Sequence, residues 1–126
     1  GVVPDMGSSW LLSRALNYNQ ALAMTLTGEP MSAEEAAVAG MIWRCVDDEQ
    51  LADTAQQLAE KLAQCSPAAI RRSKQLLAAA ADNSYAQQLE LERELQTVSF
   101  GGKAFKEGLQ SFAERRPADF ISCGDD

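Results

Sequence analysis

Helix start and stop signals recur at short intervals along this chain, and they constrain its fold more than any other feature. Ser32 and Glu35 have the spacing of a capping box, in which the serine hydroxyl accepts from the Glu35 amide and the carboxylate reaches back to the Ser32 amide. Ser66 followed by Pro67 has the pattern of an N-cap before a proline at the first helical position. Over residues 8–116 the sequence therefore predicts a string of helices and an all-α fold.

The expected helices follow from these signals and from apolar residues at helical spacing. Gly28 ends an apolar segment over residues 21–26, and Gly40 ends the short helix that the capping box begins. In the next helix, apolar residues at i, i+4, i+7 and i+8 from Leu51 predict that one face lies in a core. The later helices are expected over these ranges: Asp47 or Asp48 to Ala63, Pro67 to about Ala81, Tyr85 to Val98, and Lys103 to Arg116.

The opening segment, residues 1–4, is the only one with the pattern of a strand end. Val2 and Val3 are β-branched and favour a strand. Because everything that follows is predicted to be helical, no partner strand is expected within the chain. We therefore expect the chain to be the C-terminal part of a longer protein whose sheet lies ahead of Gly1.

Charge and residue types exclude several classes of function. The chain has 18 acidic and 11 basic residues and a formal net charge of −7, which disfavours general nucleic-acid binding. The absence of histidine excludes Ser-His-Asp and Cys-His catalysis and imidazole-bound metal. No apolar run is long enough to span a bilayer and no secretory signal opens the chain, so a cytoplasmic location is expected.

The cysteines and tryptophans are expected to serve packing rather than chemistry. Cys45, Cys65 and Cys123 are widely spaced and odd in number, which favours reduced thiols over a disulfide framework or a zinc site. Cys45 and Cys65 are expected to be small core residues. Trp10 and Trp43 are also expected to be buried rather than to form a binding platform. In a chain separated from the rest of its fold, residues 10–12 and part of the helical face are expected to expose apolar surface, which favours association or rearrangement.

Asp5 is the first candidate for chemistry. It lies in a turn, residues 3–9, between the expected strand end and a helix N-terminus. By itself this position favours a helix cap or an ordinary turn carboxylate. A catalytic role needs support from elsewhere in the sequence.

A series of sequence blocks supplies that support. They are GVVPDMGSSWLLSR (residues 1–14), LTG (26–28), MSAEEA (31–36), AGMI (39–42), LAEKLA (58–63), SPAA (66–69), Lys74 and FKEGLQSFAERRP (105–117). Their order and spacing resemble the enoyl-CoA hydratase/isomerase (crotonase) superfamily just past the middle of its sequence. Within it, Pro4-Asp5 with Trp10, and residues 41–43, are most similar to the ring-epoxide isomerase branch of phenylacetate degradation, which acts on 2-(1,2-epoxy-1,2-dihydrophenyl)acetyl-CoA.

The resemblance implies a fold in two parts. Residues 1–45 match the end of a spiral core that holds an acyl-CoA, and residues 46–126 match the helices that drive assembly into trimers, often paired into hexamers. The resemblance also implies a thioester enolate, held by two backbone N–H groups that lie ahead of Gly1. The loss of even one such donor typically costs about 2.7 to 4 kcal/mol. The chain alone is therefore expected to be inactive, with an acyl-CoA as the parent's substrate and no metal or other cofactor.

The resemblance also assigns site residues. Asp5 matches the carboxylate that shuttles a proton in the isomerase branches, whereas typical hydratases have Gly there. Phe112 and Arg115 match an aromatic and a basic residue that reach the adenine and 3′-phosphate end of a CoA on the neighbouring subunit. The alternative for these two is that Phe112 fills the core while Arg115 and Arg116 complement the helix dipole, an effect of about 0.3 to 1 kcal/mol.

Two other functions stay open from the sequence. One is an oligomerisation module without a site of its own, in which Asp5 only caps a helix. The other is a fragment of an enoyl-CoA hydratase or of a non-catalytic relative. The sequence ahead of Gly1 distinguishes them, because it would show a second catalytic acid and the oxyanion-hole residues.

Overall fold

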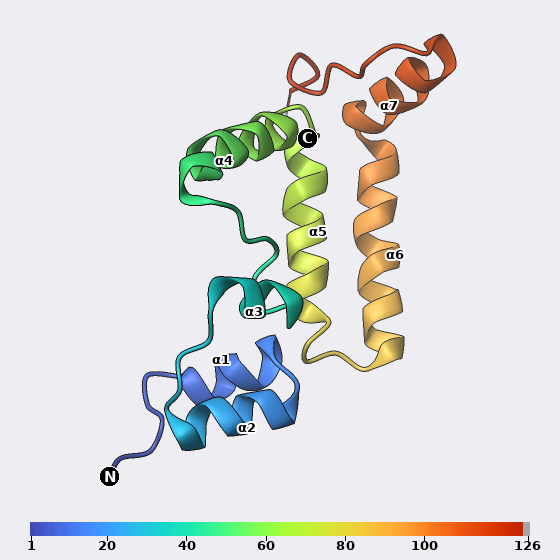
Figure 1. The fold of residues 1–126 in the computed structure, drawn as a ribbon. Coiled ribbons are helices and arrows are strands. Elements are labelled where there is room, and N and C mark those ends of the chain that lie inside the picture. The colour runs from blue at the N-terminus through green and yellow to red at the C-terminus, as the bar shows by residue number, and fades with distance from the viewer. Residues whose placement is uncertain (125–126) are drawn as a thin grey trace. The chain divides into compact units, whose positions relative to one another are not determined.

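The computed structural model describes residues 1–124, and in that range it contains seven helices and no strand (Figure 1). The all-α prediction is confirmed. The helices are α1 (Ser8–Ala15), α2 (Tyr18–Thr27), α3 (Ala33–Val38), α4 (Asp48–Ala63), α5 (Pro67–Ala79), α6 (Tyr85–Gly101) and α7 (Lys103–Glu114). None of these helices has the combination of length and hydropathy needed to cross a membrane.

Contacts between residues divide the chain after Leu51 into two units. The first contains α1, α2 and α3, and the second contains α5, α6, α7 and most of α4. The functional division between residues 45 and 46 stays a prediction.

Local capping accounts for α2 and α3 in the first unit. Asn17 caps α2 by accepting from the Gln20 amide at 3.0 Å. Gly28 ends α2 in the left-handed conformation, at φ 69°, as the sequence predicts. The predicted capping box at α3 is present: the Glu35 amide donates to Ser32 Oγ at 3.1 Å, and the Ser32 amide donates to Glu35 Oε2 at 2.8 Å.

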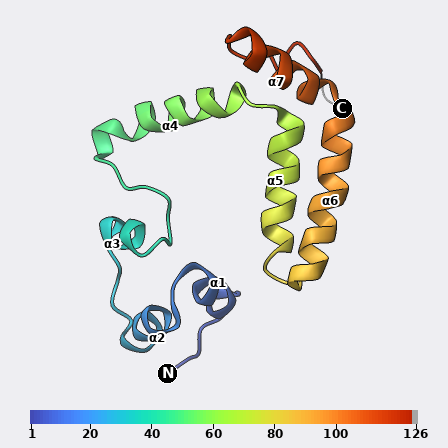
Figure 2. The same ribbon diagram turned by 90° about the vertical axis from the view of Figure 1, so that its right-hand side faces the viewer.

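In the second unit, α5 and α6 lie side by side and run antiparallel (Figures 1 and 2). Ser66 caps α5 by accepting from the Ala69 amide, with Pro67 at the first helical position, as predicted. Two polar contacts join the helices: Gln88 Nε2 donates to the Leu76 carbonyl at 3.1 Å, and Arg72 Nη1 donates to Ser99 Oγ at 3.2 Å. These contacts fix the register of the pair at both ends.

The end of α7 differs from the sequence prediction. The helix stops at Glu114, two residues before the predicted end, because Arg115 adopts the left-handed conformation at φ 54° and ψ 40°. The Arg115 amide donates to the Phe112 carbonyl and the Arg116 amide to the Ser111 carbonyl, the pair of bonds of a Schellman motif. Glycine usually occupies the left-handed position of this motif, so the sequence indicates an end at Pro117 and not at Arg115.

The predicted strand end does not form in the described residues. Val2 and Val3 are exposed and lie outside regular secondary structure. A strand needs a partner to accept its backbone hydrogen bonds, and residues 1–124 contain no other strand. The strand prediction for residues 1–4 is therefore wrong for this chain.

The buried core is small. Among residues 1–124, the buried residues are Leu16, Ala21, Ala36, Ser66, Ala68, Gly102 and Ser111. The chain exposes 9876 Å², whereas a compact chain of this length exposes about 6,600 Å², and two separate compact bodies of the same total mass about 7,900 Å². Several helix faces therefore lack a partner within the chain.

This exposure corrects several burial predictions. Trp10 and Trp43 are 54% and 70% exposed. Cys65 is exposed and Cys45 half-buried, so neither is a core residue. Leu51 and the rest of the apolar stripe of α4 also lie outside any core, since none of the residues of that helix is buried. The exposure of Trp10 follows the expectation for a chain separated from the rest of its fold, whereas the other burial predictions assumed packing against another element of the same chain.

Candidate functional site

Asp5 lies on a tight turn that leads into α1. Ser8 donates twice to the Asp5 carbonyl, from its amide at 2.9 Å and from its hydroxyl at 2.7 Å. Met6 and Gly7 have positive φ angles of 51° and 84°, which is the signature of a type I′ turn. The main chain of Asp5 therefore closes the turn.

The carboxylate of Asp5 does not cap the helix. The N-cap of α1 is Gly7, and no side chain accepts from the first amides of that helix. The Asp5 side chain is exposed, and within residues 1–124 no hydrogen bond or ion pair to its carboxylate is found. The helix-cap interpretation of Asp5 is wrong, and its carboxylate is available for another role.

Two non-glycine residues in the described range have positive φ, and both belong to candidate site segments. Met6 follows Asp5 directly, and Arg115 is itself a candidate. Such conformations cost about 1 to 3 kcal/mol each and tend to cluster at functional sites, where the surrounding structure enforces them.

Phe112 and Arg115 lie together at the C-terminal end of α7. Phe112 lies in the last turn of the helix, and Arg115 is the left-handed residue that directly follows its last residue, Glu114. Phe112 is 86% exposed, so the core interpretation of its side chain is wrong for this chain. Arg115 is also exposed, and the part of the chain that the structure describes gives its guanidinium no ion pair.

Arg116, in contrast, is fully engaged. Its Nη1 and Nη2 donate to the two carboxylate oxygens of Glu107 at 2.5 and 3.0 Å, and its Nε donates to Glu114 Oε2 at 2.6 Å. The hydrogen bond from Arg116, followed by that from the Asp119 amide at 2.8 Å, lowers the pKa of Glu107 to about 2. Arg116 therefore ties the C-terminal segment back onto α7.

The sequence analysis missed this ion pair. Glu107 and Arg116 are nine residues apart, beyond the i, i+3 and i, i+4 spacings that pair charges along one helix. They meet only because the chain reverses at Arg115. The one available signal was Pro117, which limits how far the helix can continue.

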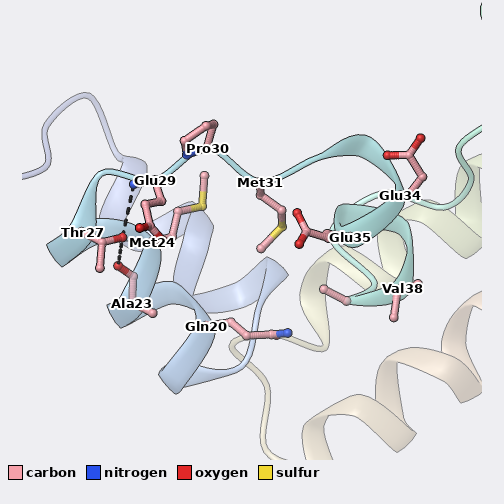
Figure 3. Close-up of a pocket in the computed structure, with 11 residues that line it drawn as sticks. Gln20, Ala23, Met24, Thr27, Glu29, Pro30, Met31, Glu34, Glu35 and Val38 are labelled. Carbon is pink, nitrogen blue, oxygen red and sulfur yellow. Dashed lines mark hydrogen bonds between the residues drawn. The ribbon is translucent and has the colours of Figure 1, made fainter.

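A groove lies between α2 and α3 in the first unit (Figure 3). Met24, Met31 and Val38 give it apolar surface, and it has a volume of about 520 Å³. The complete lining is Gln20, Ala23, Met24, Thr27, Glu29, Pro30, Met31, Glu34, Glu35, Val38 and Ala39. Asp5 is not part of the lining, so the candidate acid and this groove are separate features.

A second groove, of about 350 Å³, lies in the second unit. It is mostly apolar and is lined by Ser66, Ala68, Ala69, Arg72, Ser99, Gly102, Ala104, Phe105, Gly108, Leu109 and Phe120. It does not include Phe112 or Arg115. Among residues 1–124, no group of three or more Cys, Asp and Glu side chains has the geometry to hold a metal ion.

The structure thus brings together one pair of predicted site residues. Phe112 and Arg115 share the end of α7, in the second unit, whereas Asp5 belongs to the first unit. The assignments of all three residues stay predictions, since the geometry shows their availability and not their use.

Comparisons with known proteins identify the family. Residues 1–122 match the family described as enoyl-CoA hydratase/isomerase. The chain is 41% identical over 120 residues to a 1,2-epoxyphenylacetyl-CoA isomerase of Escherichia coli, a match that covers 95% of this chain and 46% of that protein. It is 37% identical over 120 residues to a probable enoyl-CoA hydratase of Rhodobacter capsulatus, covering 95% and 47%.

Solved structures agree with these relatives. An enoyl-CoA hydratase from Bacillus anthracis superposes with a TM-score of 0.88 at 28% identity, covering 94% of this chain and 46% of that one. One from Geobacillus kaustophilus gives a TM-score of 0.87 at 32% identity, with the same coverage. The chain spans about half the length of the relatives it matches. With nearly every residue inside the matched region, the chain belongs to the enoyl-CoA hydratase/isomerase family.

Proposed function

We propose that this chain is the assembly half of an acyl-CoA isomerase in which Asp5 carries a proton. The observation that carries the proposal is the Asp5 turn, which is closed by the main chain and leaves the carboxylate outside the cap of α1. The 41% identity to a 1,2-epoxyphenylacetyl-CoA isomerase favours the isomerase over the hydratase and favours a place in phenylacetate or fatty acid breakdown.

The proposed chemistry proceeds through a thioester enolate. The Asp5 carboxylate takes a proton from a carbon of the acyl group, the electron pair moves onto the thioester oxygen, and the proton returns at another carbon. A carboxylate can accept a proton in one step and donate it in the next, as general acid–base catalysis requires. Two backbone N–H groups from the part of the fold ahead of Gly1 stabilise the enolate oxygen.

The second unit contributes assembly and CoA recognition in this proposal. Phe112 stacks on the adenine and Arg115 pairs with the 3′-phosphate of a CoA on the neighbouring subunit of a homotrimer or hexamer. The exposed Phe112 ring and the exposed Arg115 side chain support this role. Residues 1–126 alone are proposed to be inactive, and the whole enzyme is proposed to be cytoplasmic and to need no cofactor beyond its CoA thioester substrate.

A fusion protein tests the proposal. Residues 1–126 are joined to the N-terminal part of the E. coli isomerase, in place of its own C-terminal half, and turnover of 1,2-epoxyphenylacetyl-CoA is measured. Asp5→Asn is expected to lower kcat at least about a hundredfold with little change in KM, because general acid–base catalysis contributes about 10² to 10⁴ in rate. Asp53→Asn, at an exposed position on α4, is the matched control and should leave kcat unchanged.

Near-normal kcat for Asp5→Asn in an active fusion refutes the proton-carrier role and favours an oligomerisation module. The second candidate function, an enoyl-CoA hydratase, is supported by the 37% identity to the R. capsulatus protein. It predicts that the same fusion adds water to a trans-2-enoyl-CoA and shows no isomerisation that depends on Asp5.

A further inference from the structure

The carboxylate of Glu107 organises the C-terminal end of α7. It accepts from both terminal nitrogens of Arg116 and from the Asp119 amide. The Glu107 side chain is only 12% exposed, so these bonds form in a partly shielded position. One side chain on the second turn of α7 therefore fixes the path of the chain after that helix.

Arg116 has little capacity left for a ligand. Besides Glu107, its Nε donates to Glu114 and its Nη1 donates to the Pro117 carbonyl at 3.0 Å. Adjacent Arg115 differs, because the described residues give it no acidic partner. Glu107 and Glu114 thus engage Arg116, an arrangement called here the Glu107 clamp. Arg115 is left as the cation near Phe112 in the sequence.

The conformation of Arg115 needs such support. Its left-handed backbone is strained for a residue with a Cβ, and strained residues persist only where the surrounding structure enforces them. Two main-chain bonds hold the turn to the helix that precedes it, from the Arg115 and Arg116 amides to the Phe112 and Ser111 carbonyls. The bonds of the Glu107 carboxylate to Arg116 and to the Asp119 amide hold the segment that follows the turn.

The charges near the turn at Arg115 also favour Arg115 over Arg116 as the phosphate-binding residue. Glu107 and Glu114 are both close to the end of α7 and would repel an anion placed there. Arg116 pairs with both carboxylates, which reduces that repulsion. The positive charge of Arg115 is then the one left to meet a phosphate.

We propose that Glu107 is a positioning residue that acts through Arg116: it keeps the turn at Arg115 left-handed and so presents Arg115 and Phe112 to an adenosine 3′-phosphate. The inference rests on the proposed function, because the ligand it names is the adenosine 3′,5′-bisphosphate end of CoA.

The first test measures the turn without any ligand. Amide hydrogen exchange is followed by NMR in the 126-residue chain, comparing the wild type with Glu107→Ala. The Arg115 and Arg116 amides are expected to exchange about tenfold faster or more in the variant, because their bonds to Phe112 and Ser111 then open more often. Glu90→Ala is the matched control, since it removes the carboxylate of an exposed ion pair, with Arg93, in the same unit. Unchanged exchange at Arg115 and Arg116 overturns the positioning role.

The second test measures phosphate recognition. The fusion protein with the N-terminal part of the E. coli isomerase is titrated by calorimetry, because the proposed CoA site includes the core of the neighbouring subunit. The two ligands are adenosine 3′,5′-bisphosphate and adenosine 5′-monophosphate, which lacks the 3′-phosphate. We expect an affinity ratio of about tenfold in favour of the bisphosphate, the size of one hydrogen bond to a charged group. Glu107→Ala and Arg115→Ala should both bring the ratio close to one, and Glu107→Gln should restore part of it because its amide oxygen still accepts.

The outcomes separate the two ideas. If the wild type binds both nucleotides equally, the CoA role of Arg115 fails whatever Glu107 does to the turn. If the wild type discriminates and Glu107→Ala discriminates equally well, only the positioning role fails. A general loss of structure lowers both affinities together and leaves faster exchange at amides throughout the chain, so it does not mimic the expected change in ratio.

Discussion

The guanidinium carbon of Arg14 lies 3.8 Å from the centre of the Trp10 ring, one turn along α1. Arg44 covers Trp43 in a similar way at 4.6 Å. In each case a cation lies over one face of an exposed indole. Each tryptophan ring therefore contacts a positive charge and is not enclosed in an apolar core.

This arrangement predicts charge-selective fluorescence quenching. In a Trp43→Phe background, iodide should quench Trp10 more effectively than caesium, because the anion is attracted by Arg14 and the cation is repelled. Arg14→Ala should reduce the iodide-to-caesium ratio of quenching constants. A ratio that is the same with and without Arg14 contradicts the contact between Arg14 and Trp10.

The Glu107–Arg116 pair predicts a specific acid sensitivity. Its partners lower the pKa of Glu107 from 4.5 to about 2 in the folded chain. The stabilisation is therefore fully present above about pH 4.5 and is lost as the pH falls towards about 2. Glu107→Gln should weaken the dependence of the free energy of unfolding on pH in this window, as measured by urea denaturation at a series of pH values.

The control for this measurement is Glu90→Gln. The pKa of Glu90 is also lowered, chiefly by its hydrogen bond with Arg93. This variant therefore measures how the loss of an exposed ion pair within one helix changes the pH dependence of the free energy of unfolding. If the two variants change the pH dependence to the same extent, Glu107 has no special place in the acid response.

The capping box of α3 predicts a measurable loss of stability. Ser32→Ala removes the acceptor for the Glu35 amide and should lower the free energy of unfolding by about 1 kcal/mol. Ser13→Ala is the matched control, because the Ser13 hydroxyl only donates to a carbonyl within its own helix. Chemical denaturation of both variants compares them, and equal losses would mean that the capping box adds nothing.

Arg115→Gly is predicted to separate stability from recognition. Glycine adopts the left-handed conformation without the Cβ penalty, so the variant should be about 1 kcal/mol more stable than the wild type. It should nevertheless lose the preference for adenosine 3′,5′-bisphosphate, since the cation is gone. Thermal unfolding and the nucleotide titration together check this, and a destabilised glycine variant would contradict the strain at Arg115.

Self-association is expected from the uncovered apolar faces. Leu109 is 56% exposed and lines the groove of the second unit, so an aqueous solution of the chain should contain assemblies at micromolar concentration. Leu109→Glu should shift light-scattering masses towards the monomer, whereas Gln57→Glu, at an exposed polar position on α4, should not. A chain that stays monomeric at these concentrations contradicts the assembly proposal.

Much of the secondary structure was predictable because its causes are local. The Ser32–Glu35 box, the Ser66-Pro67 start and the left-handed Gly28 each depend on residues within four positions, and all three are present. The end of α7 was not predictable in this way. The residue that adopts the left-handed conformation there is Arg115 and not a glycine, and Glu107, whose carboxylate binds Arg116, lies eight residues before it.

Burial was predicted poorly for a different physical reason. An apolar stripe such as the one containing Leu51 shows that a helix needs a partner, but it does not show whether that partner belongs to the same chain. Trp43 was expected in a core on the same assumption, whereas the segment of Trp10 was expected to be exposed in a chain separated from the rest of its fold. The positions of Asp5, Phe112 and Arg115 as candidates came from family resemblance, whereas the Glu107 clamp is visible only in three dimensions.

The turn at Asp5 has a consequence for substitutions at this position. Ser8 donates to the main-chain carbonyl of Asp5 and makes no hydrogen bond to its side chain. The side chain at position 5 can therefore be substituted without loss of the hydrogen bonds that close the turn. Position 5 can therefore carry an acid, an amide or the hydrogen of glycine while the turn keeps the same main-chain hydrogen bonds. A saturation library at this single codon would sample reactivity while leaving folding nearly constant.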